Sequence, residues 1–465
     1  MIPMTISEIA SIVHGEIYGI AADLVITQIP VIDSRLASAD TFFVAFNGEK
    51  VDGHDFVALA ISAGAPFALV SKKVDAPSIV VEDVTKALSL LAHEVRRRLP
   101  DLQVIGITGS QGKTTTKDLL LHILRTQGET IAPQGSLNNE LGVPLTLLRC
   151  NEGTRFCISE MGARHIGDIA HLVEIAEPNI GMVLVVGSAH IGEFGSRENI
   201  AAAKAEMISS LPDGSTAILG TYDPYTPHMA DGLDLATLTF GEKHDCTVRA
   251  ADIEYREGRA HFDLVTPEGR AAVGLQLVGA HQLPNALAAA AAATALHVPI
   301  DTIAASLSTA ELLSKWRMEM HEESGLLLIN DSYNANPESM AAALRTQALL
   351  AQERGGVTWA YLGKMHELGE SEREDHAEIG KLACEIGIDH LICVGCDLYL
   401  APAADSDIDL GDETQMHSFA THDESLSLVS HFSAGDVVLV KASRAEEFNL
   451  LADKILATWK EAQLA

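Results

Sequence analysis

Short apolar runs alternate with stretches of helical periodicity along most of the chain. Residues 102–108 (LQVIGIT) and 155–163 (RFCISEMGA) contain apolar, β-branched runs of the length expected for buried strands. After the first run, residues 114–128 carry apolar side chains at helical spacing. Strands that alternate with helices in this way predict an α/β protein.

The same pattern divides the chain into three blocks. Residues 1–82 mix short strands with a helix, which predicts a small α/β domain. Residues 83–313 open with a helix and then alternate strands with helices, which predicts a central α/β domain. Residues 314–465 contain four apolar runs separated by helical stretches, so a second α/β sheet is expected there. The length of 465 residues alone suggests about three domains.

A glycine-rich turn joins the strand at 102–108 to the helix that follows it. The segment reads GITGSQGKTTTK, and Ile107 stands where the common phosphate-loop pattern has its first glycine. In a strand–turn–helix unit, successive backbone N–H groups and the positive helix end point at one anion. Gly109 and Gly112 would let the backbone approach phosphate, Lys113 would reach the outer phosphates, and the Thr114 hydroxyl could bind Mg²⁺. An ordinary turn is the alternative, and this order of elements disfavours it.

Two further polar side chains come after predicted strands, where open α/β sheets bind ligands. Glu160 ends the apolar run at 155–163, the position of a metal-directed acid in many nucleotide-hydrolysing folds. His190 ends the run that begins at Ile180. Because Mg²⁺ prefers oxygen ligands and a strand-end histidine is more often structural, Glu160 is the stronger candidate.

Lys204 stands on the apolar face of a predicted helix. It is four residues from both Ile200 and Ile208, so the three side chains share one stripe. A lysine there must extend to solvent, find an anion, or lose its charge. A neutral buried amine can add CO₂ to become a carbamate, which supplies an anionic oxygen to a metal ion. Extension to solvent is the simpler alternative.

Composition limits the partners of this protein. The formal charge is −32, which argues against nucleic acid or an anionic membrane as a main partner. The N-terminus lacks a basic stretch followed by an apolar core, so no secretory signal is expected. The alanine-rich run at 285–298 is too short for a membrane span and predicts a buried core helix. Six scattered cysteines suit a reducing compartment, and we expect a cytoplasmic monomer.

Several motifs together resemble those of the Mur ligase family. That family's loop is TG[ST]xGKT[ST], matched by residues 108–115, which accounts for the missing first glycine. VGAHQLPNALAA at 278–289 resembles its GxHxxxNxLAA element, and KWRME at 315–319 resembles its G-R-x-E element, with Trp316 in place of glycine. The resemblance covers nearly the whole chain. It implies a UDP-binding domain at 1–82, a P-loop-type mononucleotide-binding domain at 83–313 and a Rossmann-like domain at 314–465.

Other elements are similar to those of family members that add a dipeptide. These are SLNNELGVPLTLL at 136–148, NDSYNANPESM at 330–340 and LGKMHELGESEREDH at 362–376. They imply an enzyme that joins D-alanyl-D-alanine to UDP-N-acetylmuramoyl-tripeptide, with ATP activating the tripeptide carboxylate as an acyl phosphate. The sequence leaves open whether the third peptide residue is lysine or diaminopimelate.

The resemblance also implies roles for individual residues. Lys113, Glu160, His190, Lys204 and Arg317 would be catalytic. Two Mg²⁺ ions would be held with the help of Thr114, Glu160, His190 and a carbamylated Lys204. ATP would contact Gly109, Ser110, Gln111, Gly112, Lys113, Thr114, Thr115, His281, Asn285, Arg317, Asp331, Tyr333 and Asn334. The UDP-linked substrate would contact Ser34, Arg35, Asn138 and Asn139.

One segment departs from the family pattern. Where the resembling enzymes commonly read L-N-x-D-D, this chain has Gly220, Thr221, Tyr222 and Asp223 after Leu219. An amide side chain and one acid are therefore missing near the central sheet, and the sequence does not identify a substitute.

Two other functions remain open from the sequence. A sister amino-acid ligase, such as a folylpolyglutamate synthetase, would share the loop and its metal-directed residues, but the 330–340 motif and the N-terminal block disfavour it. A regulatory P-loop NTPase would use hydrolysis to drive a conformational switch. The chain has no guanine-reading N-K-x-D element, and a switch would not need a third domain that supplies Arg317 and Asp331.

Overall fold

The N-terminal part of the chain forms a small sheet with helices beside it. The computed structural model describes residues 1–48, 51–135, 137–311, 313–400 and 414–464. Five strands lie in the order β2 (Glu16–Tyr18), β7 (Ser78–Val80), β6 (Ala68–Val70), β5 (Thr41–Val44) and β4 (Ile29–Val31). The pairing is parallel except between β2 and β7. Helices α1 (Ile6–Ile12) and α2 (Val57–Ser62) accompany it, and β1 (Met4–Thr5) pairs with β3 (Val25–Ile26).

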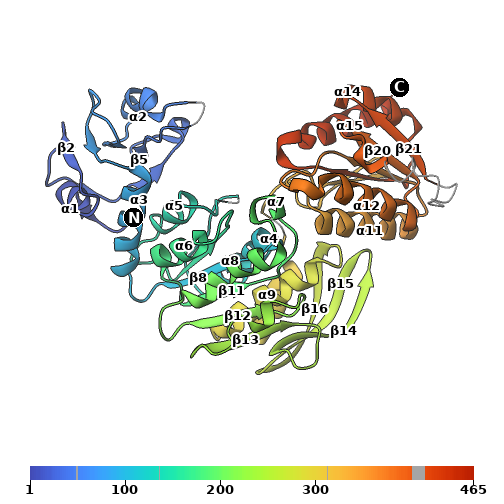
Figure 1. Ribbon diagram of the computed structural model, residues 1–465, viewed down its shortest axis with the longest axis horizontal. Coiled ribbons are helices and arrows are strands. Elements are labelled where there is room, and N and C mark those ends of the chain that lie inside the picture. The colour runs from blue at the N-terminus through green and yellow to red at the C-terminus, as the bar shows by residue number, and fades with distance from the viewer. Residues whose placement is uncertain (49–50, 136, 312, 401–413, 465) are drawn as a thin grey trace.

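The central part contains a nine-stranded sheet. In spatial order the strands are β16 (Gly269–Val278), β15 (Arg259–Thr266), β14 (Val248–Arg256), β13 (Ala236–Gly241), β12 (Thr216–Gly220), β11 (Ile180–Val183), β8 (Gln103–Thr108), β10 (Phe156–Glu160) and β9 (Thr130–Ile131). Strands β14, β15 and β16 form an antiparallel meander at one end, and the remaining pairs are parallel. Figure 1 shows this part between the N-terminal and C-terminal sheets.

Helices cover both faces of the central sheet because its strands are apolar on both sides. Val104 of β8 packs with α3 (Val84–Arg97), α5 (Gly142–Leu147), α6 (Asp168–Ala176) and α8 (Arg197–Ser209). The next residue, Ile105, packs on the opposite face with α4 (Lys113–Leu124), α9 (Gln282–Ala295) and α10 (Ile300–Thr309). This alternation follows the two-residue period of a strand. The alanine-rich run lies in α9 and is buried, as the sequence predicted.

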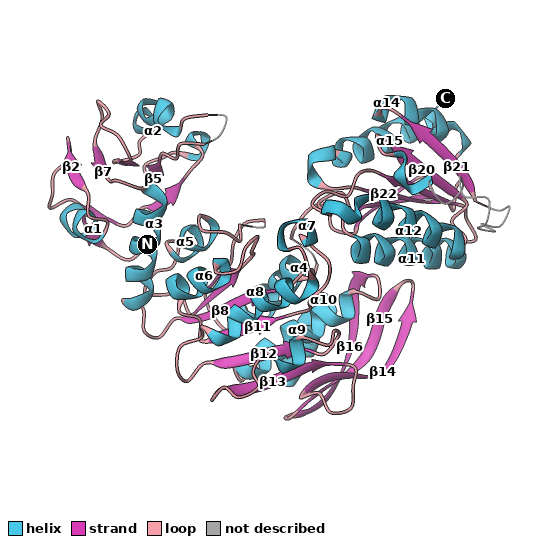
Figure 2. Cartoon of the chain, in the orientation of Figure 1, coloured by secondary structure: helices cyan, strands magenta, loops and turns pink. Residues whose placement is uncertain are grey.

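The C-terminal part repeats this layered arrangement on a six-stranded sheet (Figure 2). The order is β17 (Glu319–Glu323), β18 (Leu326–Asn330), β22 (Val437–Lys441), β19 (Thr358–Leu362), β20 (His390–Val394) and β21 (Gln415–Phe419), and only β17 runs antiparallel. Helices α11 (Pro337–Arg354) and α12 (Glu372–Glu385) pack on one face, and α15 (Phe448–Leu464) packs on the other. Two short helices are also present, α7 (Ile191–Phe194) in the central part and α14 (His422–Ser425) in the C-terminal part. The predicted fold class, three α/β domains, is confirmed.

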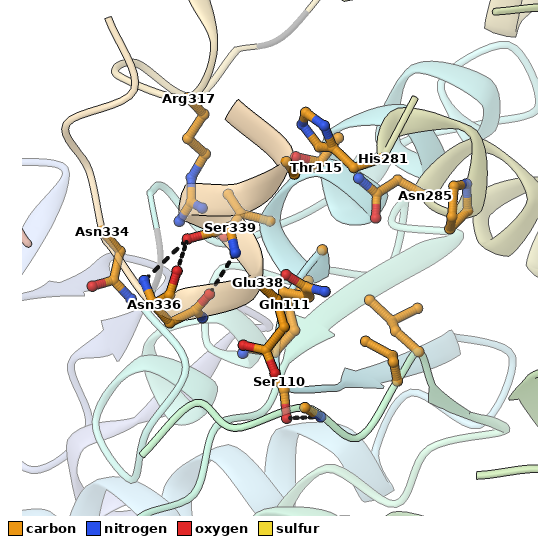
Figure 3. A pocket seen from close by; sticks show the side chains of 18 of the residues that line it. Ser110, Gln111, Thr115, His281, Asn285, Arg317, Asn334, Asn336, Glu338 and Ser339 are labelled. Atoms are coloured by element: carbon orange, nitrogen blue, oxygen red, sulfur yellow. Dashed lines mark hydrogen bonds between the residues drawn. The ribbon is translucent and has the colours of Figure 1, made fainter. Parts of the chain in front are cut away.

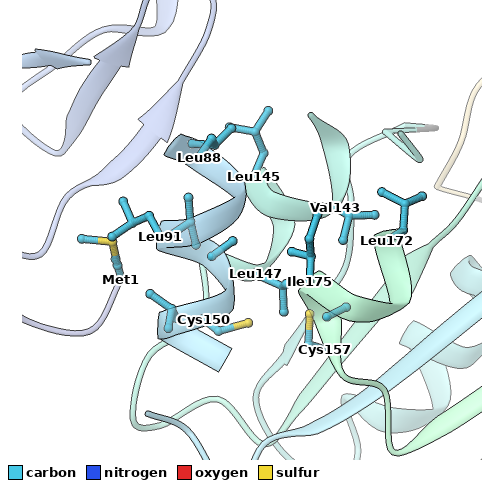
Figure 4. Packing of buried hydrophobic residues seen from close by; sticks show 14 of the residues in the cluster. Met1, Leu88, Leu91, Val143, Leu145, Leu147, Cys150, Cys157, Leu172 and Ile175 are labelled. Carbon is cyan, nitrogen blue, oxygen red and sulfur yellow. The ribbon is translucent and has the colours of Figure 1, made fainter. Parts of the chain in front are cut away.

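One apolar cluster joins the N-terminal part to the central part. Met1 packs in the same cluster as Leu88 and Leu91 of α3 and Val143 of α5 (Figure 4). The predicted boundaries at 82/83 and 313/314 stay predictions. Among the described helices, none combines the length and apolar character needed to cross a lipid bilayer.

Candidate active site

The glycine-rich turn forms the floor of a pocket between the central and C-terminal sheets. Gly112 caps α4 with φ of 83°, a left-handed conformation that favours glycine. A β-carbon at this position would lie 2.3 Å from Asn285 Oδ1, so a larger residue would also clash. The Lys113 ammonium donates to the Gly109 carbonyl at 2.7 Å. The strand–turn–helix geometry predicted for phosphate binding is therefore present.

The pocket has a volume of about 580 Å³ and receives side chains from both sheets (Figure 3). The predicted nucleotide residues that line it are Ser110, Gln111, Gly112, Lys113, Thr114, Thr115, His281, Asn285, Arg317, Asp331, Tyr333 and Asn334. Glu160, His190 and Asn138 line it as well. Residues separated by more than two hundred positions in the sequence thus face one cavity, and its concave, mixed polar and apolar lining suits a small ligand.

Glu160 lies where β10 ends, directly behind the start of α4. Its side chain is buried, and its two oxygens accept hydrogen bonds from Thr114 Oγ1 at 3.0 Å and Asn138 Nδ2 at 3.1 Å. A hydroxyl and a carboxylate oxygen are ligands that suit Mg²⁺. Within the described residues, no group of three or more His, Cys, Asp and Glu side chains is placed to hold a metal ion. A magnesium ion here would therefore need further oxygens from phosphate or water.

His190 lies in a different local structure from the one the sequence suggested. Strand β11 ends at Val183, and His190 instead caps the short helix α7 with φ of 63°. The prediction that His190 ends a strand was wrong because the apolar run continues into a loop. His190 Nδ1 lies 2.5 Å from the Glu367 carboxylate of the C-terminal part. The hydrogen bond to His190 lowers the pKa of Glu367 below its usual value.

Lys204 is buried in α8, as its position on the apolar stripe predicted. Its exposed fraction is 3%, and it has no ion pair among the residues that the structure describes. Burial, with a smaller contribution from the Lys113 charge, lowers the pKa of Lys204 to about 7. An appreciable fraction of the amine is therefore neutral near neutral pH. Extension to solvent, the simpler alternative, is excluded by this burial.

Asp331, which follows β18, connects two other segments of the C-terminal part at the pocket. Its Oδ1 accepts from the Met318 backbone N–H at 3.1 Å, and its Oδ2 accepts from Lys441 Nζ at 2.5 Å. Lys441 is buried at the end of β22 and also donates to the Asn334 carbonyl at 3.0 Å. The sequence reasoning missed Lys441, although it follows an apolar strand just as Glu160 does.

The segment that carries Arg317 has an unusual backbone. Trp316 adopts φ of 60°, a left-handed conformation that is rare for a bulky residue. The resembling family has glycine at this position, and the backbone keeps the conformation that glycine favours. The Arg444 guanidinium lies 4.2 Å from the Trp316 ring centre. Arg317 itself lies 4.0 Å from the ring centre of Tyr333, so two cation–π contacts hold this segment.

His281 and Asn285 approach the pocket from the start of α9. Asn285 Nδ2 donates to Gln282 Oε1 at 3.0 Å, which orients the amide toward the glycine-rich turn. Burial lowers the pKa of His281 to about 4; Asp331 raises it and Lys441 lowers it. His281 is therefore neutral at physiological pH.

Glu338 is a second residue that the sequence reasoning missed. It lies in the first turn of α11 and accepts hydrogen bonds from the Ser188 backbone N–H and hydroxyl, both at 2.8 Å. A capping box between Asn336 and Ser339 fixes the start of the same helix (Figure 3). Glu338 thus connects the two sheets at the pocket, and no local sequence signal identified it.

The residues predicted to hold the UDP-linked substrate lie in two places. Asn138 lines the pocket, whereas the Asn139 side chain accepts from the Gly142 N–H at 3.1 Å, near the start of α5. Ser34 and Arg35 lie in the N-terminal part, outside the pocket, and the Arg35 guanidinium pairs with Asp33 at 2.5 Å. Their substrate roles, and those of the other predicted site residues, stay predictions.

Comparison with known proteins follows the same three-part division. Residues 28–106 match the description "Mur ligase family, catalytic domain", residues 107–293 match "Mur ligase middle domain", and residues 316–444 match "Mur ligase, glutamate ligase domain". The chain is 37% identical over 501 aligned positions to a UDP-N-acetylmuramoyl-tripeptide–D-alanyl-D-alanine ligase of Mycobacterium bovis, covering 98% of each chain.

Solved structures give the same result. MurF from Acinetobacter baumannii superposes with a TM-score of 0.85 at 32% identity, covering 98% of this chain and 99% of that one. MurF ligase from Thermotoga maritima in complex with ADP superposes with a TM-score of 0.78 at 28% identity, covering 94% of this chain and 99% of that one. Sequence motifs, fold and pocket agree with these matches, and the chain belongs to the Mur ligase family of ATP-dependent ligases.

Proposed function

We propose that this enzyme joins D-alanyl-D-alanine to UDP-N-acetylmuramoyl-tripeptide, with conversion of ATP to ADP and phosphate. The observation that carries the proposal is the single pocket in which the phosphate loop, Glu160 and Arg317 meet. The printed names of the full-length relatives supply the substrates. The proposed cellular location is the cytoplasm, where ATP and UDP-linked precursors are available, and the proposed state is a monomer.

The chemistry follows from the charges in the pocket. A carboxylate does not form an amide unaided in water, so its oxygen attacks the γ-phosphorus of ATP, and ADP leaves as the acyl phosphate forms. The two reacting anions repel each other. Lys113 and Arg317 line the place where they must meet and would stabilise the negative charge there. The dipeptide amine then attacks the acyl carbon, loses a proton, and displaces phosphate.

Magnesium would neutralise the phosphates when bound. Thr114 and Glu160 fit one ion, because their oxygens already lie together at 3.0 Å. A second ion would use His190 and a carbamylated Lys204. The lowered pKa of Lys204, about 7, supports the carbamate because only the neutral amine adds CO₂.

The carbamate has its own test. Lys204→Arg keeps the positive charge but cannot form a carbamate, so we expect it to lose most ligase activity. Lys204→Ala should also fail, with partial rescue by added short carboxylic acids that occupy the vacated space. Wild-type protein in ¹³C-bicarbonate should show a carbamate carbon signal that both variants lack. Full activity in Lys204→Arg would make Lys204 a structural residue.

A phosphate-release assay tests the ligase itself. Phosphate should appear only when ATP, a UDP-muramoyl-tripeptide and D-alanyl-D-alanine are all present, and testing both tripeptides would identify the third residue. Turnover with single amino acids in place of the dipeptide would favour a sister ligase. Turnover indifferent to both substrates would favour a regulatory NTPase.

A further inference from the structure

Helix α4, which begins at the glycine-rich turn, contains two adjacent charged residues in its buried part. Lys117 and Asp118 have exposed fractions of 3% and 1%, and the ammonium lies 2.8 Å from the carboxylate. Neighbouring residues on a helix point in different directions, so the two side chains must bend toward each other to form this ion pair. Burying two charges is costly unless further polar contacts compensate them. The other contacts of the two charges therefore bear on their role.

Lys117 contacts the segment of the chain that leads to Asn138. Its ammonium donates to the Pro133 carbonyl at 3.2 Å and to the Gly135 carbonyl at 3.4 Å. Three residues after Gly135, the Asn138 amide lines the pocket and donates to the Glu160 carboxylate at 3.1 Å. Because Lys117 holds two carbonyls just before Asn138, it limits where this amide can lie in the pocket.

Asp118 contacts the segment of the chain that leads to Arg317. Its Oδ2 accepts from the Ser314 backbone N–H at 3.1 Å, although the two residues are 196 positions apart. Three residues after Ser314, Arg317 lines the pocket. The next residue, Met318, donates its backbone N–H to Asp331 of the C-terminal part at 3.1 Å. The segment is thus held by α4 at one end and by the C-terminal part at the other, with Arg317 between them.

We propose that Lys117 and Asp118 are positioning residues, which fix two segments of the active site relative to the phosphate loop. Lys117 holds the segment at 133–138, and Asp118 holds the segment that carries Arg317. Lys113 lies about one turn earlier on the same helix, so the phosphate loop and both segments share one support. This inference rests on the proposed function, in which groups from both segments act in one reaction. The pair itself touches no substrate and acts through the backbone that it holds.

A double variant without charges separates positioning from stability. Lys117→Met/Asp118→Leu replaces the pair with apolar side chains of similar volume, an exchange that often leaves the stability of a fold unchanged or higher. We expect its melting temperature to stay near that of wild type. The value of kcat should fall about tenfold to a hundredfold, because Arg317 is no longer held in place. The KM for the UDP-muramoyl-tripeptide should rise about fivefold, because the segment at 133–138 is released.

A second variant and a second measurement distinguish the two contacts. Amide hydrogen exchange reports on Ser314 without ligase turnover, and this amide should exchange about tenfold faster in Lys117→Met/Asp118→Leu, where it has lost its acceptor. In Lys117→Met/Asp118→Asn, the asparagine oxygen can still accept from the Ser314 N–H. This variant should therefore recover slow exchange at Ser314 and most of the wild-type kcat, while the KM for the tripeptide stays raised.

The matched control is Lys381→Met/Glu385→Leu, which removes a solvent-exposed ion pair of α12 and should keep wild-type kinetics and exchange.

Several results would overturn the proposal. They are wild-type kinetics or wild-type exchange at Ser314 in Lys117→Met/Asp118→Leu, and a wild-type KM for the tripeptide in Lys117→Met/Asp118→Asn. A lower melting temperature with unchanged kinetics would make the pair purely structural. If wild type showed no dipeptide-dependent turnover, the proposed function would fail, and the exchange at Ser314 would then decide whether Asp118 holds its segment.

Discussion

The central and C-terminal sides of the pocket differ in whether their lysines have a carboxylate partner. On the central side, Lys113 lines the pocket, and Lys204 lies near it without lining it. Neither has a carboxylate partner in an ion pair among the residues that the structure describes, and burial lowers the pKa of both. On the C-terminal side, Lys441 is as buried as Lys204 but lies 2.5 Å from the Asp331 carboxylate. Burying a charge is costly unless a counter-charge compensates. The central side is thus incomplete without an anion, and the C-terminal side is complete before any ligand arrives.

This difference separates two kinds of residue. Lys113 and Lys204 lie where phosphate and carbamate oxygens would supply the missing negative charge, so their effects should be on catalysis and ligand binding. Lys441 neutralises Asp331, which in turn holds the Met318 backbone next to Arg317. Its effect should be on the shape of the pocket. The following experiments separate these roles, starting with the largest expected effect.

Lys113→Ala should abolish ligation while leaving the fold intact. Loss of one charge-stabilising group of this kind costs on the order of 10²–10³ in rate. Phosphate release gives the rate, and circular dichroism with a melting curve gives the fold. Because the Lys113 ammonium donates only to the Gly109 carbonyl in the described structure, the melting temperature should barely fall. Near-normal turnover in Lys113→Ala would contradict a catalytic role for the glycine-rich turn.

The central side could be predicted from the sequence because its signals are local. The glycine turn, Glu160 at a strand end and Lys204 on a helical stripe each depend on spacing within a few residues. The C-terminal side depends on contacts between distant segments, so Arg317 and Asp331 came only from family resemblance. Lys441 could have been predicted as a site residue, because it lies at the end of an apolar strand just as Glu160 does.

Other features could not have come from the sequence by any local rule. Glu338 is an ordinary first-turn acid until the fold brings Ser188 to it. The loop that carries His190 looks like a continued strand, because its residues are as apolar as those of β11. In the loop that carries His190, tertiary packing sets the direction of the backbone, and the pattern of apolar residues does not reveal it.

Protonation of His281 adds a further positive charge between the two sides, and its effect can be measured on the stability of the fold. Its pKa is about 4 in the folded chain and about 6.5 when unfolded, so the unfolded state binds more protons between these values. Stability from this group is therefore complete above about pH 6.5 and is lost as pH falls toward 4, by roughly 3 kcal/mol at most.

Melting curves of wild type and His281→Gln at pH 7.5 and pH 4.5 measure this contribution. The acid-induced loss of stability should be smaller in the variant, since glutamine does not titrate. An identical loss in both proteins would mean that His281 is already solvated or protonated without cost.

Lys441→Met should raise the KM for ATP more than it lowers kcat. It removes a charged hydrogen-bonding partner from Asp331, which costs about 1.5–3 kcal/mol, or roughly tenfold to a hundredfold in affinity. Lys454→Met is the matched control, because its pair with Asp423 at 2.6 Å is exposed to solvent and should contribute under about 1 kcal/mol. Equal effects in the two variants would contradict the view that Lys441 shapes the pocket.

Glu338→Ala should give the smallest effect, because it weakens the contact between the two sides and leaves the lysines of both sides unchanged. Its two hydrogen bonds to Ser188, both 2.8 Å, are partly accessible to water and together contribute about 1–2 kcal/mol. The KM for ATP should rise several-fold with little change in kcat, and small-angle scattering should show a larger radius of gyration in the free enzyme. Saturating nucleotide should restore the compact form, because in the proposed function the phosphates would bridge Lys113 and Arg317. Ser188→Ala removes only one of the two bonds and should lie between wild type and Glu338→Ala. If neither the KM nor the radius changed, the two sides would be held together by the remaining interface contacts, such as His190 with Glu367.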